Sequence, residues 1–93
     1  MNEELLAFFK ALSSENRQHI MLLFMNGKRM TVNEIAEAAG LGQSTTSEQL
    51  AILKRAGLLT AEKVGKEVFY RPDKAKIVEL LDALSAFLKS CCD

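Results

Sequence analysis

The stretch TVNEIAEAAGLGQSTTSEQLAILKRAGLLTAEKVGKEVFYR, residues 31–71, decides the fold of this chain. Residues 31–34 form a capping box, in which the threonine and the glutamate each accept a hydrogen bond from the other's backbone amide, so a short helix is predicted to begin there. Gly40 is expected to end that helix in the left-handed conformation. A second helix is predicted to open at Gly42 and to end at Gly57. Two helices joined by so short a glycine turn indicate a helix–turn–helix.

A β-hairpin is predicted directly after these two helices. Residues 59–64 and 67–71 have the composition of short strands, and Gly65-Lys66 between them fits a two-residue turn with glycine first. Helix, turn, helix and hairpin in this order predict a mainly α winged helix–turn–helix, in which the hairpin is the wing.

Further helices are predicted on both sides of this motif. Residues 3–12 carry leucine and phenylalanine at helical spacing, and Ser13-Ser14 provides a cap for a second helix that runs to about Met25. Pro72 cannot continue a central strand, and Asp73 is expected to cap a final apolar helix over 74–90. Since 93 residues suffice for one domain, residues 1–93 are predicted to form a single winged-helix DNA-binding domain.

Charge and cysteine content narrow the class of protein. Twelve Lys and Arg balance twelve Asp and Glu, which argues against a simple nucleic-acid binder, although residues 41–71 carry five basic against three acidic residues. No apolar run is long enough to span a membrane, and the acidic start MNEELL differs from a secretory signal. The two cysteines are adjacent in sequence, which excludes a disulfide framework, so a cytoplasmic location is expected.

The segment QSTTSEQ, residues 43–49, is rich in short polar side chains. Such a helix enters the major groove by its N-terminal half, where hydroxyl and amide groups bond base edges and the helix N-terminus attracts phosphate. A polar helix start is often only a solvated face, but hydroxyl residues are poor choices for a purely solvated helix. Positions 44, 47, 48 and 51 share one side. The predicted DNA contacts are Gln43, Ser44, Thr45, Ser47, Glu48, Gln49, Lys54, Lys63, Lys66 and Arg71.

The chain resembles the ArsR/SmtB family of bacterial repressors over KALSSENRQHIMLLF at 10–24, over 32–70 and over the terminal helix. The arrangement L-x-Q-S-T-x-S-x-x-L-x-x-L-x-x-A-G at 41–57 is specific to that family's recognition helix. The resemblance implies binding to an inverted repeat in promoter DNA and release by an inducer. The chain departs from many relatives at Glu48-Gln49, where they carry histidine. A carboxylate there repels phosphate but accepts from cytosine N4, which leaves the operator sequence open.

A homodimer built on residues 3–12 and 74–90 is also implied by the resemblance. Both segments carry more leucine and phenylalanine than a chain of 93 residues easily buries. The predicted interface residues are Leu5, Leu6, Phe9, Leu80, Leu84, Phe87 and Leu88.

The resemblance also indicates where relatives hold metal or thiol sensors. Thr31 and Asn33 stand where some relatives have a Cys-x-Cys, and Leu22 stands where others have a sensing cysteine. His19 is the only histidine, and zinc needs more donors than it provides. The residues aligned with the zinc ligands of the terminal helices are Lys74, Lys76, Phe87 and Ser90. No zinc-type site and no required cofactor is therefore predicted.

Cys91 and Cys92 remain as candidate inducer ligands. Some arsenic-responsive relatives carry a cysteine pair at the end of this helix, usually with a third cysteine beyond it. One hypothesis is therefore a trivalent arsenical bound by both thiols. Two free thiols on a frayed terminus, or a pair that reacts with oxidants or persulfides, are the alternatives.

The predicted function is a homodimeric repressor that a thiol-reactive or metalloid inducer, above all an arsenical, releases from its operator. A winged helix that only binds protein is an alternative, which zero net charge and Glu48 favour, and a constitutive repressor without thiol sensing is another. An enzyme is not expected, since there is no Ser-His-Asp set, phosphate loop or C-x-x-C. The expected partners are double-stranded promoter DNA and a second copy of the chain, and no membrane.

Overall fold

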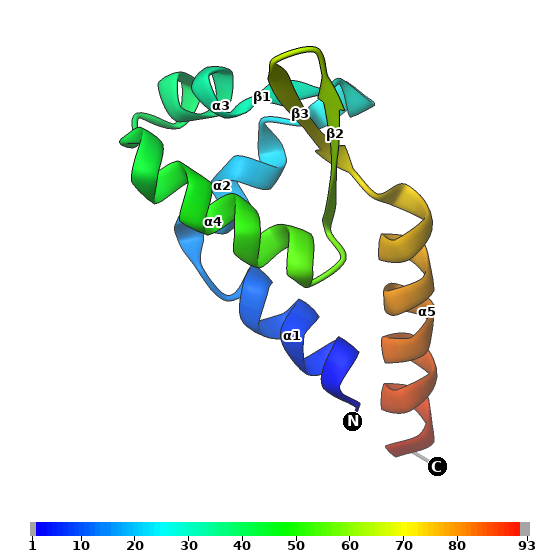
Figure 1. Ribbon diagram of the computed structural model, residues 1–93. Helices are drawn as coiled ribbons and strands as arrows, with labels where there is room; N and C mark the ends of the chain where they lie inside the picture. The colour runs from blue at the N-terminus through cyan, green and yellow to red at the C-terminus, as the bar shows by residue number, and fades with distance from the viewer. Residues whose placement is uncertain (1, 92–93) are drawn as a thin grey trace.

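Five helices, a short 3-10 turn and three strands follow one another in the computed structural model, which describes residues 2–91 (Figure 1). In chain order they are α1 (Glu3–Leu12), α2 (Glu15–Leu22), η1 (Met25–Gly27), β1 (Met30–Thr31), α3 (Val32–Ala39), α4 (Gln43–Arg55), β2 (Leu59–Val64), β3 (Glu67–Pro72) and α5 (Lys74–Cys91). The order of helices and hairpin confirms the predicted winged helix–turn–helix.

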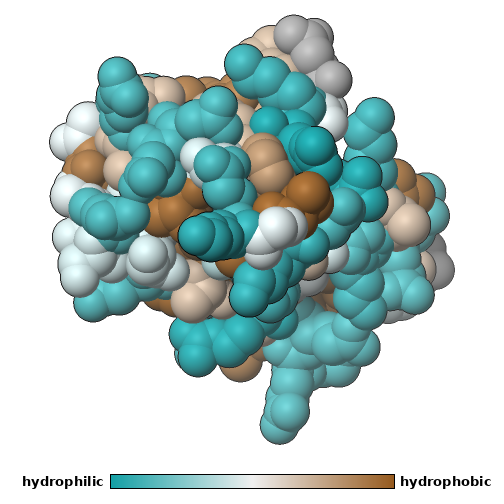
Figure 2. All heavy atoms as spheres, turned by 45° about the horizontal axis from the view of Figure 1, so that its top comes forward, coloured by the Kyte–Doolittle hydropathy of each residue, from teal (hydrophilic) through white to brown (hydrophobic). Residues whose placement is uncertain are grey.

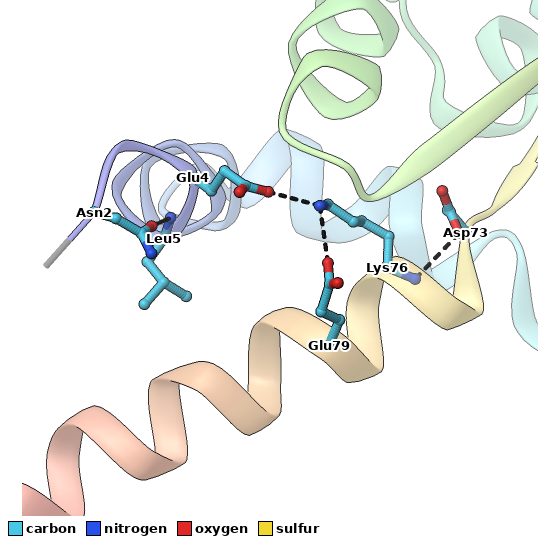
Figure 3. Close-up of polar contacts among 6 residues, drawn as sticks. All are labelled: Asn2, Glu4, Leu5, Asp73, Lys76 and Glu79. Atoms are coloured by element: carbon cyan, nitrogen blue, oxygen red, sulfur yellow. Dashed lines mark hydrogen bonds and ion pairs between the residues drawn. The ribbon is translucent and has the colours of Figure 1, made fainter.

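Short polar side chains begin four of the helices by accepting a backbone hydrogen bond. Asn2 Oδ1 accepts from the amide of Leu5 at 2.8 Å at the start of α1, and Ser14 Oγ does the same for α2 at 3.3 Å. Both halves of the predicted capping box at Thr31 and Glu34 are present, at 3.2 and 2.8 Å. Asp73 caps α5 at 3.2 Å (Figure 3). These caps satisfy amides that have no partner within the helix, so they set where each helix begins.

The segment between α2 and α3 differs from the prediction. The second helix ends at Leu22 rather than near Met25, and the 3-10 turn that follows brings Gly27 to a φ of 70°. After this reversal, residues 30–31 pair with the sheet as β1. The sequence did not indicate this strand. Only glycine adopts such a φ at little cost, so Gly27 permits the chain to turn back.

The sheet has three strands in the order β1-β3-β2, all antiparallel. Val64 lies opposite Glu67, which confirms the two-residue turn, and Gly65 has the positive φ of 62° expected of its first residue. Against expectation, Pro72 belongs to the central strand. It is tolerated there as the last residue, because β1 lies opposite Phe69 and Tyr70 only.

The core lies where α1, α2, α3 and α4 meet the base of the hairpin. Its fully buried side chains include Ile20, Ile35, Leu50 and Leu53. Thr46 is buried among them, and its hydroxyl donates to the carbonyl of Gly42 at 2.9 Å. By contrast, α5 stands along one side of the molecule (Figure 1) and has one buried residue, Leu80, within the described part of the chain.

A polar cluster joins α5 to α1. Lys76 Nζ lies 2.6 Å from Glu4 Oε2 on α1 and 2.8 Å from Glu79 Oε2 on α5 (Figure 3). The hydrogen bond to Glu4, and then that to Glu79, raise the pKa of Lys76 above its ordinary value. The stem of the same lysine passes Gly57, just after α4, so closely that a Cβ there would lie 2.8 Å from Lys76 Cγ. Lys76 on α5 therefore contacts both α1 and the residue that follows α4.

Within residues 2–91, no helix is both long enough and apolar enough to cross a lipid bilayer.

Candidate nucleic-acid interface

The helix–turn–helix is formed by α3 and α4. Gly40 ends α3 at a φ of 69°, in the left-handed region, as predicted, and its amide bonds back to the last turn of the helix. Gly42 then caps α4 in an extended conformation. Because the two glycines leave only Leu41 between them, α4 starts close to the end of α3 and its N-terminus faces outward at one end of the molecule (Figure 1).

The N-terminal half of α4 presents hydroxyl, amide and carboxylate groups to solvent. Positions 44, 47, 48 and 51 are all exposed, which confirms that they share an outer face. Figure 2 shows the side of the molecule that carries the wing, and its surface is mostly hydrophilic, with apolar patches between polar side chains. The predicted contacts that are exposed on α4 are Gln43, Ser44, Thr45, Ser47, Glu48 and Lys54.

Gln49 departs from its predicted place on the exposed face. It is half-buried, and its Oε1 accepts a hydrogen bond from Nη1 of Arg17 on α2 at 3.0 Å. The reason is the helical period, which places position 49 beside the buried positions 46, 50 and 53 rather than beside 44, 47 and 48. Its acceptor oxygen therefore points toward the protein and not toward a base edge.

The wing supplies positive charge beside α4. Lys63 and Lys66 are exposed, whereas Arg71 lies 3.9 Å from Glu62 Oε2 in an ion pair. Arg29, which sequence reasoning missed, pairs with Glu62 Oε1 at 3.8 Å and stacks over Phe69 with its guanidinium carbon 4.2 Å from the ring centroid. The basic pair Lys28-Arg29 is visible in the sequence. It lies beside the wing only because β1, which follows it directly, joins the sheet.

A shallow cleft of about 240 Å³ separates the wing from the start of α4. Beside this cleft, Gln43 Nε2 of α4 donates to Asn33 Oδ1 of α3 at 2.5 Å. The cleft is lined by Thr31, Val32, Asn33, Gln43, Lys66, Glu67 and Val68. The cleft thus holds one lysine and one carboxylate, from Lys66 and Glu67, together with several neutral polar groups near the N-termini of α3 and α4.

The predicted dimer residues fall into two groups. Leu6, Phe9, Phe87 and Leu88 are 43%, 40%, 38% and 52% exposed, which is high for such side chains. Leu5 and Leu80 are each only 3% exposed, because both turn into the core of the same chain. Leu84 is half-buried and packs against that core. Leu5 and Leu80 therefore have no surface to offer a partner; the exposed Val78 and Leu81, missed from the sequence, do.

Cys91 is exposed at the end of α5, and Cys92 lies outside the described residues. Among residues 2–91, no group of three or more His, Cys, Asp and Glu side chains is close enough to hold a metal ion.

A helix–turn–helix whose second helix is polar and exposed, and which stands beside a basic hairpin, defines a winged-helix DNA-binding domain. Residues 14–61 match the model of the bacterial regulatory protein family arsR. The uncharacterised HTH-type transcriptional regulator YbzH of Bacillus subtilis is 37% identical over 82% of this chain and 90% of that protein. The biofilm growth-associated repressor of Xylella fastidiosa is 32% identical, over 87% of this chain and 70% of that protein.

A solved structure agrees with these sequence matches. The homodimeric winged helix–turn–helix DNA-binding domain Mb0332 of Mycobacterium bovis superposes with a TM-score of 0.75 at 28% identity, covering 94% of this chain and 80% of that one. The chain belongs to the arsR family of bacterial regulatory proteins. It is thus a DNA-binding transcriptional regulator with a winged helix–turn–helix fold.

Proposed function

We propose that this regulator represses transcription as a homodimer bound to an inverted repeat, and that an arsenical, or another thiol-reactive inducer, bonded to Cys91 and Cys92 releases it. The observation that carries the DNA-binding part is the exposed, hydroxyl-rich N-terminal half of α4 beside a wing that exposes Lys63 and Lys66. Ser44 and Ser47 offer donors and acceptors to base edges, and Glu48 accepts from cytosine N4. Lys63 and Lys66 meet the flanking phosphates.

The dimer is supported by apolar surface that the single chain leaves uncovered on α1 and α5. Leu6 and Phe9 of α1 and Phe87 and Leu88 of α5 are all exposed, and the two helices pack against each other. Large apolar side chains gathered on adjacent helices indicate an interaction surface. A two-fold dimer presents two copies of α4, which matches the symmetry of an inverted repeat.

The proposed inducer site depends on the reaction of trivalent arsenic with the thiols of Cys91 and Cys92. An organoarsenical of the form R–As(OH)₂ reacts with two cysteine thiols to form two As–S bonds and releases two waters, so no oxidant or reductant is needed. Adjacent side chains on an α-helix diverge by about 100°. An arsenic bonded to both sulfurs is therefore incompatible with α-helical geometry across residues 91–92, and we expect its binding to unwind the last turn of α5. Arsenite, which takes three sulfurs, needs one more from an external thiol.

We expect unwinding of α5 to release the protein from its operator, because α5 belongs to the proposed dimer surface. Phe87 and Leu88 lie about one turn before Cys91, so unwinding this end displaces side chains that the proposed partner covers. A change in dimer geometry alters the separation of the two α4 helices, and an allosteric coupling of about 1–3 kcal/mol is ordinary for such systems.

The test begins with a duplex selected by the wild-type protein from a random library. Its affinity is then measured without additive and with phenylarsine oxide, arsenite, a persulfide donor or zinc, for the wild type and for the Cys91→Ser, Cys92→Ser double variant. Ser85→Ala and Ser90→Ala on the same helix serve as matched controls. We expect the arsenicals to weaken wild-type binding about tenfold or more and to leave the double variant unaffected.

One result would contradict operator binding, and a different result would contradict release through the cysteines. Selection of no duplex contradicts operator binding. An equal response of the wild type and the double variant, or no response to any thiol-reactive compound, shows the cysteines to be bystanders.

A further inference from the structure

Arg17, on the first turn of α2, makes three side-chain hydrogen bonds to two other helices. Its Nε donates to the carbonyl of Ala11 at 2.7 Å and its Nη2 to the carbonyl of Lys10 at 3.0 Å, both at the end of α1. Its Nη1 donates to Oε1 of Gln49 on α4 at 3.0 Å. Within residues 2–91, this is the one side-chain hydrogen bond that joins α2 to α4.

The bonds to α1 give Arg17 a rigid base. The last carbonyls of a helix lack partners within it and carry partial negative charge, which suits a guanidinium. The planar guanidinium has its donors in fixed directions, so engaging two carbonyls orients the third nitrogen. Arg17 is half-buried, and hydrogen bonds are electrostatically stronger at such a site than in full solvent.

The hydrogen bond between Arg17 and Gln49 can form only over a narrow range of rotation of α4 about its own axis. Side-chain tips lie about 5–6 Å from the axis of a helix, so a rotation of about 20° moves them by about 2 Å and breaks a hydrogen bond. The same rotation displaces Ser44 and Ser47, because they project from the same rigid helix. Gln49 is therefore well placed to hold the DNA-reading face at one angle.

We propose that Arg17 is a positioning residue, which sets the rotation of α4 relative to the end of α1 through Gln49. It thereby aligns the DNA-reading face with α1, one of the two helices of the proposed dimer surface. This inference rests on the proposed function, because it concerns how α4 meets an operator. It assigns the side chain of Gln49 to a hydrogen bond within the protein and leaves base contact to the residues at 44, 47 and 48.

The chain offers variants that separate this role from mere stabilisation. Gln49→Leu removes the acceptor on α4 and leaves both bonds from Arg17 to α1 intact. Arg17→Ala removes all three bonds, and Arg17→Lys keeps the charge but has one nitrogen for three separated acceptors. Gln18→Ala is the matched control, since Gln18 Nε2 donates to the carbonyl of Leu12 at 2.6 Å and so caps the same end of α1.

Binding is measured to the selected duplex and to a scrambled duplex of the same length, over a range of salt. We expect Arg17→Ala, Arg17→Lys and Gln49→Leu each to weaken operator binding about tenfold, with scrambled DNA bound as before and an unchanged salt slope. The double variant Arg17→Ala, Gln49→Leu is expected to lose no more than either single change, because both break one link. Gln18→Ala is expected to bind both duplexes like the wild type.

Amide hydrogen exchange in the free protein provides a readout that does not depend on DNA. Arg17→Ala and Gln49→Leu are expected to speed exchange at the same amides of residues 43–55, and Gln18→Ala only at α1 and α2. Additive losses of operator affinity, or no change in α4 exchange with Gln49→Leu, overturn the inference. If the wild type selects no duplex, the proposed function fails by itself, and the exchange pattern alone decides the role of Arg17.

Discussion

Replacing Gly57 by alanine perturbs the joint between α4 and the wing at a point where both the backbone and the space are restricted. Gly57 has a φ of 85°, and a Cβ built on it lies 2.8 Å from Lys76 Cγ and 3.5 Å from Leu80 Cδ1. The Cγ atom is close to the backbone of α5, so it cannot swing away as the tip of a lysine can. Moving it also withdraws Lys76 Nζ from Glu4.

Gly57→Ala lowers the free energy of unfolding in two ways. The left-handed conformation costs a residue with a Cβ about 1–2 kcal/mol. Forcing a methyl group into occupied space costs roughly 1–3 kcal/mol more. Gly57→Ala is therefore expected to destabilise the fold by roughly 2–5 kcal/mol, which lowers Tm by about 8 °C or more for a domain of this size.

Thermal and urea unfolding, followed by circular dichroism at one fixed protein concentration, measure this loss. Gly40→Ala is the matched control, because Gly40 has a φ of 69° but a Cβ there meets nothing within 4 Å. It is expected to show only the conformational part, about 1–2 kcal/mol. In a Lys76→Ala background, the penalty of Gly57→Ala is expected to fall to that of Gly40→Ala. A Gly57→Ala penalty equal to that of Gly40→Ala in the wild-type background would refute the reasoning.

Three further predictions concern DNA binding and assembly. Ser47→Ala, at an exposed position of α4, is expected to weaken operator binding by about 1–3 kcal/mol and to leave the thermal unfolding curve unchanged; an unchanged operator affinity means that this face is misassigned. Lys66→Ala, at the turn of the wing, is expected to weaken binding to every duplex alike and to reduce the slope of log affinity against log salt by about one unit, and a sequence-selective loss contradicts the phosphate contact. Phe9→Glu with Phe87→Glu, both at exposed apolar positions, is expected to yield folded monomers in analytical ultracentrifugation that no longer bind the operator, whereas a dimer that survives both changes excludes this surface.

Local chemistry predicted most of the elements. The caps at Ser14, Thr31 and Asp73 and the glycine turns at Gly40 and Gly65 depend on side chains within a few residues, so they are visible in the sequence. The strand β1 was not, because its two residues form a strand only through pairing with Tyr70 and Phe69 far along the chain. The early end of α2 has the same origin, since the chain must turn back to bring β1 to the sheet.

The candidate site was predicted in part for a related reason. Helical periodicity identified the outer face of α4 correctly, yet polarity alone placed Gln49 on it. Its partner is Arg17, 32 positions away in sequence, and no local pattern predicts that pairing. Likewise, the apolar character of Leu5 and Leu80 indicated burial but could not distinguish burial in the core from burial against a second chain.

The short strand β1 has a mechanical consequence for regulation. It runs straight into α3 at Thr31 and pairs with the central strand of the wing, so the sheet connects the wing directly to the helix–turn–helix. The wing and the helix–turn–helix of one protomer are thereby joined by backbone pairing through β1, which restrains how far one can shift against the other. If an inducer acts at the end of α5, as proposed above, we expect it to change mainly the spacing and angle between the two protomers. On that proposal, the inducer acts on how two winged helices are spaced on the operator, and not on the shape of either one.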